Sequence, residues 1–79
     1  MYYIYILKSA VDQKLYTGYT SDLKKRLADH ISGNVQSTRN RRPVELIYYE
    51  AYRDKMSALK REKFLKTTKR ENTVKKADL

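Results

Sequence analysis

Glu62 lies among apolar residues in a segment with helical periodicity. At about 100° per residue, Ala58, Leu59 and Leu65 form an apolar arc roughly 120° wide, and Glu62 falls inside this arc. A carboxylate that faces a core is costly unless it is paired or binds a metal. The pattern therefore indicates either a metal ligand or, as the alternative, a surface glutamate paired with Lys66 one helical turn further on.

Arg26 and His30, the single histidine of the chain, are also one helical turn apart. They border an apolar stripe formed by Leu23, Leu27 and Ile31. A guanidinium and an imidazole at the edge of a helix that packs on a sheet can stabilise a phosphate and transfer a proton. The alternative is a structural role, with Arg26 paired to Asp22 or Asp29 and His30 held in the core.

Tyrosines make up eight of the nine aromatic residues. They form three clusters, each in or beside a segment with strand character: Tyr2, Tyr3 and Tyr5; Tyr16 and Tyr19; Tyr48, Tyr49 and Tyr52. Strand tyrosines commonly cover a small core and leave the hydroxyl in solvent. Eight tyrosines exceed what a core of this size needs, so some of them are candidates for chemistry.

The elements that must position these side chains begin with two strands, predicted at 2–7 and 15–20. The first is rich in β-branched and aromatic residues and reads as a strand buried on both faces. The polar connection 10–14 is short, which predicts an antiparallel hairpin. With the turn near Asp12, Tyr5 lies opposite or diagonal to residues 16–18, so tyrosines of both strands can share one face.

A helix follows, capped by Thr20 or Ser21, with Asp22 in its first turn and Gly33 at its end. Residues 33–43 read as a polar, basic loop and 44–50 as a third strand. Asp54 caps a second helix that runs to about residue 67, and the charged tail 68–79 is either a short third helix or frayed. The order ββαβα(α) predicts one α+β domain over 1–79, a small three-stranded antiparallel sheet flanked by helices.

The net positive charge indicates which kind of molecule the protein binds. The 79 residues contain 18 Lys and Arg against 9 Asp and Glu, for a net charge of +9 and a pI near 9.9, which points to a polyanion. The candidate phosphate contacts are Lys24, Lys25, Arg39, Arg41, Arg42, Lys60, Arg61, Lys63 and Lys66. Charge alone also allows an RNA- or ribosome-associated protein whose tyrosines stack on unpaired bases.

The absence of cysteine excludes disulfides, thiol catalysis and, with a single histidine, zinc-finger sites. The longest apolar run, residues 2–7, is far shorter than the roughly 20 residues of a membrane span, and no signal peptide precedes it. We therefore expect a soluble cytoplasmic protein without a membrane partner.

Taken in order, these positions resemble the GIY-YIG nuclease superfamily over essentially the whole chain. The first motif corresponds to Tyr3-Ile4-Tyr5 and the second to Tyr16-Thr17-Gly18, with Arg26, His30 and Glu62 downstream at matching spacings. The surrounding segments are similar to the small stand-alone bacterial members, which resemble the N-terminal nuclease module of the UvrC-type excision repair nuclease.

The resemblance implies hydrolysis of DNA phosphodiester bonds with one divalent ion, Mg²⁺ (Mn²⁺ as a substitute), held by Glu62. Tyr16 would be the general base, with Tyr5 hydrogen-bonded nearby. Since a phenol is a weak base at neutral pH, this role needs positive charge close by. Arg26 would neutralise charge on the phosphate, and His30 would assist in proton transfer or phosphate binding.

Gly18 would allow a close approach of the backbone. Three positions depart from the superfamily pattern: Tyr3 replaces a glycine, Thr17 an isoleucine and Tyr19 a lysine of the excision nuclease. Asn72 is a loose counterpart of a downstream asparagine. The resemblance suggests a structure-specific, repair-related endonuclease, with a protein partner as one source of targeting. The alternative is a catalytically weak DNA- or RNA-binding module of the same fold.

Overall fold

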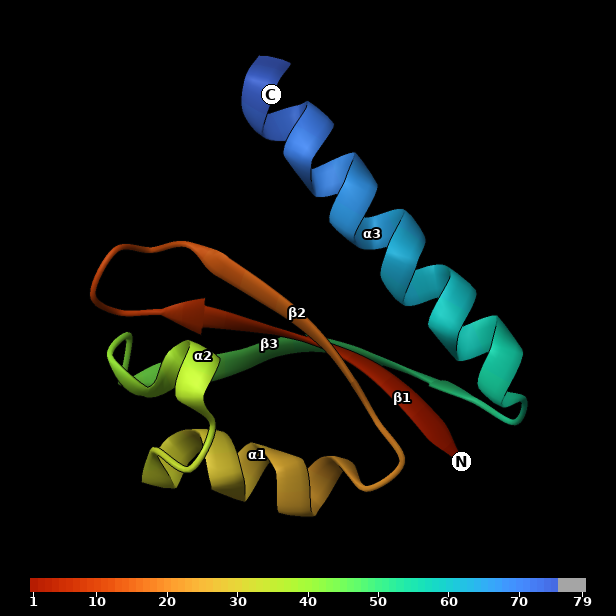
Figure 1. Ribbon diagram of the computed structural model, residues 1–79, viewed down its shortest axis with the longest axis horizontal. Helices are drawn as coiled ribbons and strands as arrows, with labels where there is room; N and C mark the ends of the chain where they lie inside the picture. The colour runs from red at the N-terminus through yellow and green to blue at the C-terminus, as the bar shows by residue number, and fades with distance from the viewer. Residues whose placement is uncertain (76–79) are drawn as a thin grey trace.

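The computed structural model describes residues 1–75, with side chains described through residue 67. It confirms the predicted order of elements and the α+β class (Figure 1). The elements are β1 (Tyr2–Ser9), β2 (Leu15–Thr20), α1 (Leu23–Ser32), α2 (Gln36–Arg39), β3 (Val44–Tyr52) and α3 (Lys55–Lys75). Within the described residues, no helix is both long and apolar enough to cross a membrane.

β1 is the central strand of the sheet, whose order is β2-β1-β3 with both pairs antiparallel. Its side chains Ile4, Tyr5 and Leu7 are buried, as its apolar sequence predicts for a strand covered on both faces. The hairpin with β2 sets Tyr5 opposite Gly18, which confirms the predicted register. The pairing with β3 shifts between Ile6 and Leu7.

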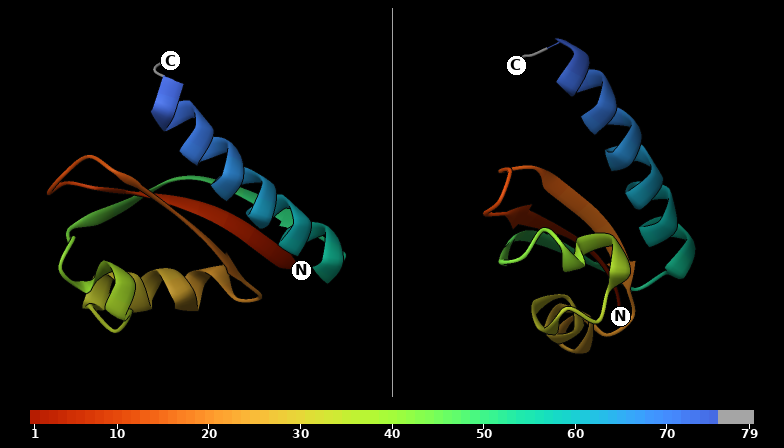
Figure 2. Two further views of the ribbon diagram at one scale, coloured as in Figure 1. Left: turned by 45° about the horizontal axis from the view of Figure 1, so that its top comes forward. Right: turned by 60° about the vertical axis from the view of Figure 1, so that its left-hand side comes forward.

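Helices cover the two faces of the sheet. Figures 1 and 2 show α1 and α2 on one face and α3 crossing the other, with the C-terminal part of α3 leading away from the strands. α3 contacts all three strands, and Ala58 is its fully buried anchor. The sheet thus separates α1 and α2 from α3.

α1 begins differently from the prediction. Its N-cap is Asp22, whose carboxylate accepts a hydrogen bond from the Lys25 amide at 3.1 Å, so the predicted cap at Thr20 or Ser21 is wrong. The hydroxyl of Thr20 instead accepts from the Asp22 amide and shapes the turn before the helix. Gly33 ends α1 as predicted, with φ at +88° in the left-handed region.

The buried stripe of α1 also differs from the prediction. Ile31 is 58% exposed and borders an open hollow beside Pro43 and Val44, whereas His30 is fully buried. A polar ring can replace an aliphatic residue there because both of its nitrogens are hydrogen-bonded. The predicted loop 33–43 contains the short helix α2, which supplies one of those partners, Thr38.

β3 and α3 are both longer than predicted. β3 continues two residues beyond Glu50, and α3 runs without a break to Lys75, so the predicted end near residue 67 is wrong. No Gly or Pro interrupts 55–75, and nothing in that stretch ends a helix. The Asp54 carboxylate accepts from the Ser57 amide at 2.9 Å, which confirms the predicted cap. Residues 76–79 and the Asn72 side chain lie outside the described part.

Candidate active site

Gly18 of β2 creates the space for Tyr5. The two residues are paired across the hairpin, and a Cβ at position 18 would lie 2.4 Å from both Cζ and Oη of Tyr5. The absence of a side chain therefore allows the Tyr5 ring to lie directly over β2, toward the α1 face. The glycine of the second motif serves, in this structure, the close approach of a tyrosine from the first.

A buried chain of hydrogen bonds joins this tyrosine to two helices. The Tyr5 hydroxyl is 2.8 Å from Nε2 of His30, and Nδ1 of His30 is 2.7 Å from Oγ1 of Thr38. All three residues are at most 1% exposed. β1, α1 and α2 are thus connected through side chains in the space between the sheet and α1.

Tyr16 completes an aromatic cluster on the same face. Its ring centroid lies 5.3 Å from that of His30 and 6.4 Å from that of Tyr5, and the Tyr5 and His30 rings are 5.5 Å apart. Tyr16 is half-buried, whereas Tyr5 and His30 are fully covered. Among these three rings, Tyr16 is therefore the one that a substrate in solvent can reach.

Arg26 of α1 adds positive charge to the cluster. Burial raises the pKa of Tyr5, and a hydrogen bond from the Arg26 guanidinium opposes that rise. Burial, and then the charge of Arg26, lowers the pKa of His30. At neutral pH the cluster therefore holds a neutral imidazole, a protonated Tyr5 phenol and a cationic, half-buried arginine.

The structure does not show the purely structural alternative for Arg26, an ion pair with Asp22 or Asp29. Asp22 caps α1, and Asp29 pairs with Lys25 at 3.6 Å. The guanidinium instead interacts with the Tyr5 hydroxyl, and this hydrogen bond raises the pKa of Arg26. For His30, both ring nitrogens are occupied and the side chain has no exposure, so the predicted direct contact with phosphate is ruled out in this conformation.

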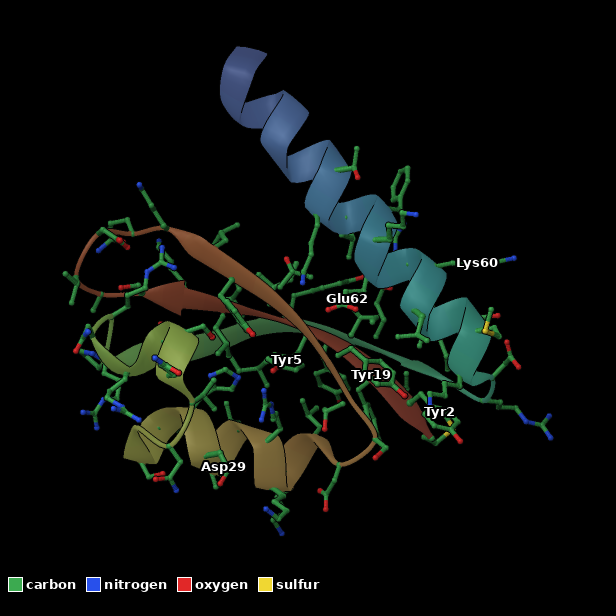
Figure 3. The ribbon with its side chains drawn as sticks, viewed as in Figure 1. Tyr2, Tyr5, Tyr19, Asp29, Lys60 and Glu62 are labelled. Carbon is green, nitrogen blue, oxygen red and sulfur yellow. The ribbon has the colours of Figure 1, made fainter. Side chains whose placement is uncertain are left out.

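Glu62 approaches from the other face of the sheet. Figure 3 shows it between α3 and the strands, whereas Lys60 points away. Its side chain is 21% exposed, and Oε2 lies 3.2 Å from Nζ of Lys66, so the predicted helical ion pair is present. The negative charge of Glu62 also contributes to the raised pKa of Tyr5, which brings the carboxylate within electrostatic range of the cluster.

The donor set limits which metals can bind here. In the described part of the chain, no three His, Asp or Glu side chains are grouped to hold an ion. A lone carboxylate fits Mg²⁺, which keeps several waters and binds through one or two carboxylates plus substrate phosphates. Glu62 would meet that requirement through Oε1, or through both oxygens once Lys66 is released.

The candidate phosphate contacts do not gather on one surface. Three of them stabilise the segment between α1 and β3: Arg39 donates to the Gly33 carbonyl, Arg42 to the Arg39 carbonyl, and Arg41 pairs with Asp12 at 3.4 Å. The lysines of α3 lie across the sheet, as Figure 1 shows for the two helices. Lys24 and Lys25 are exposed on α1, and Lys60 and Lys63 on α3.

Sequence reasoning missed two groups. Thr38 gave no signal, because it lies in a polar stretch without periodicity. The second group surrounds Glu50, which accepts hydrogen bonds from Tyr48, from Tyr52 at 2.6 Å and from Arg61 at 3.0 and 3.1 Å. The i, i+2, i+4 spacing along β3 was a usable signal, since it places three of these side chains on one face.

Tyr19, one of the predicted site residues, stacks on Tyr2, with ring centroids 6.4 Å apart.

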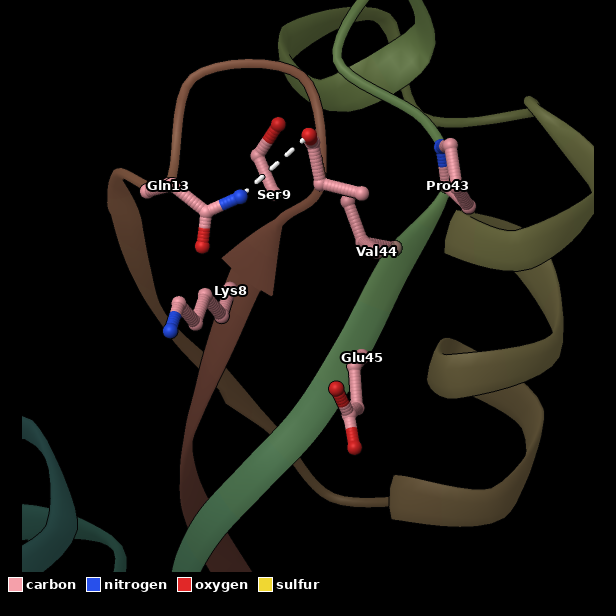
Figure 4. A pocket seen from close by; sticks show the side chains of 7 residues that line it. Lys8, Ser9, Gln13, Pro43, Val44 and Glu45 are labelled. Atoms are coloured by element: carbon pink, nitrogen blue, oxygen red, sulfur yellow. Dashed lines mark hydrogen bonds between the residues drawn. The ribbon is translucent and has the colours of Figure 1, made fainter.

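One hollow lies away from these residues, at the other end of the hairpin. The pocket in Figure 4, of about 310 Å³, is lined by the end of β1, the following turn and the start of β3, including Ser9, Gln13 and Glu45. A hydrogen bond from Gln13 Nε2 to the Ala10 carbonyl closes the turn beside it. None of the predicted catalytic side chains lines this pocket.

Two motif tyrosines, an arginine and a histidine on one face, with a glutamate on the helix opposite, define a GIY-YIG nuclease domain. The family model of the GIY-YIG catalytic domain matches residues 1–76. The chain therefore belongs to the GIY-YIG family, a nuclease family whose domain implies DNA binding.

Its relatives are small bacterial proteins of the same kind. A UPF0213 protein of Streptococcus pyogenes serotype M3 is 50% identical over 68 residues, covering 85% of this chain and 73% of the relative; one from serotype M5 matches equally. The solution NMR structure of the UPF0213 protein BH0048 from Bacillus halodurans is similar at a TM-score of 0.56 and 37% identity. That similarity covers 94% of this chain and 83% of the other.

Proposed function

We propose that this protein is a metal-dependent endonuclease that hydrolyses phosphodiester bonds in DNA. The observation that carries the proposal is the placement of Arg26 and Tyr16 beside the Tyr5–His30 pair, with Glu62 within electrostatic range. Positive charge, a solvent-accessible phenol and a lone carboxylate are the groups that phosphate hydrolysis with one metal ion requires.

The accessible residues would perform the chemistry. Arg26 would donate to the non-bridging oxygens of the phosphate and stabilise the charge that grows in the transition state. In its phenolate form, Tyr16 would accept the proton of the attacking water and become a phenol, and the positive charge of the guanidinium nearby would favour the phenolate. Tyr5 and His30 are covered, so they would hold these groups in place instead of touching DNA.

Glu62 would hold the divalent ion. When bound, Mg²⁺ supplies Lewis-acid polarisation of the phosphate and stabilises the leaving 3′ oxygen. Lys66 pairs with one carboxylate oxygen and would remain a phosphate contact once released. A Mn²⁺ titration should give one site per chain that Glu62→Gln abolishes and that Glu45→Gln, a change to an exposed glutamate far along β3, leaves unchanged.

The test of function is cleavage of end-labelled linear, flap and hairpin DNA with Mg²⁺ or Mn²⁺, at low salt because affinity for phosphates falls with ionic strength. Wild type should cut at least one substrate. Arg26→Ala should lose about 100-fold or more in rate, the usual effect of removing one transition-state donor. Arg53→Ala, an exposed arginine outside the cluster, is the matched control and should cut like wild type.

A second candidate function is a DNA- or RNA-binding module with weak catalysis. The ion pair between Glu62 and Lys66 favours it, because that pair already satisfies one oxygen of the metal ligand. This function predicts binding of the same DNA panel, or of single-stranded RNA, with equal affinity in wild type and Glu62→Gln. Binding without cleavage on every substrate, and no Mn²⁺ site, would support it over the nuclease.

A further inference from the structure

A further hollow lies between α1 and β3, on the face of the sheet that carries the candidate active site. Its volume of about 370 Å³ falls in the range of ligand pockets, about 300–1,000 Å³. Polar residues at the start of α1 contribute to its lining, which is otherwise apolar and aromatic: Tyr3 of β1, Leu23 and Leu27 of α1, and Leu46 and Tyr49 of β3. A hollow of this size and lining fits a small flat molecule.

Two tyrosines form one wall of this hollow. The rings of Tyr3 and Tyr49 lie edge to face, with centroids 6.3 Å apart and planes at 62°. Tyr49 is 53% exposed, so much of its side chain is open to a ligand instead of packed in the core. Open aromatic rings are the surfaces on which unpaired nucleic-acid bases stack, and every base has a flat face that can do so.

The hollow adjoins the candidate active site along all three of its elements. Tyr49 pairs directly with Tyr5 across the ladder of β1 and β3, a position in which Cβ atoms are about 4.5–5.5 Å apart. Tyr3 precedes Tyr5 by two residues and therefore shares its face of β1. On α1, Leu23 precedes Arg26 by three residues, a spacing that makes them neighbours on the helix surface. A DNA strand whose phosphate contacts Arg26 would thus carry the adjoining nucleotide past this hollow.

The charges around the hollow favour an anionic ligand. Lys24 lines it and is exposed, so its ammonium can follow a phosphate group. The acidic lining residue, Asp22, serves as the cap of α1 and accepts a hydrogen bond from the Lys25 amide. An apolar hollow beside a lysine, in a chain with a net charge of +9, suits a molecule that combines a flat apolar part with negative charge. A nucleotide combines the two, whereas an apolar peptide would leave the lysine unused.

We propose that this hollow binds an unpaired DNA base, stacked on Tyr49, from the nucleotide next to the phosphate that Arg26 contacts. The inference rests on the proposed function for the place of that phosphate, and it names the substrate class: DNA with an unpaired nucleotide at the cleavage point, such as a flap. A base inside a duplex would first have to leave its stack, which costs free energy. Tyr3 stands where the superfamily motif has a glycine, so this wall of the hollow is a feature of this chain.

Tyr48 supplies a matched control for Tyr49. The two tyrosines are neighbours on β3 and are 46% and 53% exposed. Tyr48 points to the opposite face of the sheet, where it donates a hydrogen bond to Glu50, the partner of Arg61 on α3. Tyr49→Ala therefore removes the stacking surface and Tyr49→Phe keeps it, while Tyr48→Ala removes a similarly exposed tyrosine away from the hollow.

The experiment measures binding in excess EDTA, so that no strand is cut. The probe is a DNA duplex with a single-stranded flap whose first unpaired nucleotide is 2-aminopurine, a fluorescent base whose emission falls when it stacks. Wild type should quench this probe and bind it at least about 5-fold more tightly than a fully paired duplex of the same length. Tyr49→Ala should bind the flap about 5- to 150-fold more weakly, the effect of removing one stacking aromatic. Tyr49→Phe and Tyr48→Ala should bind it like wild type.

Equal affinity of wild type for the flap and the paired duplex would overturn the inference, and this comparison decides it even where a variant does not fold. An unchanged affinity of folded Tyr49→Ala for the flap would overturn it as well. Tighter binding of an RNA flap of the same sequence would overturn DNA as the ligand class. A wild type that binds the flap through Tyr49 but cuts no DNA would count against the nuclease proposal alone, because affinity is measured without metal.

Discussion

Gly18→Ala tests the contact on which the candidate site is built. The added methyl would lie 2.4 Å from Cζ and Oη of Tyr5, where ordinary contact begins at 3.4 Å, so the tyrosine ring must retreat by about 1 Å. The ring is 1% exposed and held by His30 at 2.8 Å, so it cannot swing freely into solvent. The substitution must therefore strain the core or break the hydrogen bond.

The magnitude follows from those two outcomes. Overpacking a core costs about 1–3 kcal/mol, and a lost hydrogen bond contributes about 0.5–1.5 kcal/mol more. For a domain of this size about 1 kcal/mol shifts the midpoint of thermal unfolding by 4–8 °C, so a decrease of at least about 6 °C is expected. The cleavage rate of the folded variant should fall by about 100-fold, as for a misplaced reacting group.

Thermal unfolding followed by circular dichroism, together with the His30 imidazole spectrum, measures both effects. Gly33→Ala is the control, because its cost comes from the left-handed φ of +88° at the end of α1 and from the Arg42 guanidinium, 2.7 Å from the added Cβ, and not from Tyr5. It should lose stability while the imidazole signals stay in place. A Gly18→Ala protein that melts within about 2 °C of wild type with an unchanged His30 spectrum would refute the close-contact reasoning.

Two further predictions concern stability. Hydrogen bonds from Arg61, Tyr48 and Tyr52 lower the pKa of Glu50 to about 2 from its ordinary 4.5. Its ionised form therefore stabilises the fold fully above pH 4.5, and that contribution disappears as pH falls from 4.5 toward 2. After allowance for solvent at the partly exposed Arg61, this contribution to the free energy of unfolding should be about 1–3 kcal/mol. Urea unfolding of wild type should show a loss of stability between pH 7 and pH 3 that Glu50→Gln lacks. Equal pH dependence in the two proteins would exclude the contribution. Thr17→Val should raise the free energy of unfolding by about 1 kcal/mol, because a buried hydroxyl without a partner is removed. Urea unfolding measures this, and a decrease in the urea midpoint would mean that the hydroxyl is hydrogen-bonded.

Local patterns predicted the scaffold of the site well. Alternation and a short polar turn placed Tyr5 opposite Gly18, and helical periodicity placed Glu62 toward the sheet. Both are consequences of regular geometry within one or two elements, which the order of residues determines directly. The superfamily resemblance, confirmed by the family match, came from the same residues at the same spacings.

What the sequence did not predict depends on contacts between distant segments. The sequence left the burial of His30 open as an alternative. Its buried partner Thr38 is eight residues away, on a short helix that no periodicity predicts. Arg39 and Arg42 bind backbone carbonyls, and this depends on where the segment after α1 folds back. Their charge alone therefore predicted only that both would contact phosphate. The sequence underestimates the length of α3, because a charged stretch such as 68–75 is compatible with a frayed tail as well as with a continued helix.

The most direct test of the nuclease proposal is a time course of wild-type protein on labelled flap DNA, with Mg²⁺ and with excess EDTA, beside Glu62→Gln. Strand cleavage should need the metal, and Glu62→Gln should lose it while it still binds the DNA. Cleavage that continues in EDTA, or that Glu62→Gln performs at the wild-type rate, would contradict the proposal.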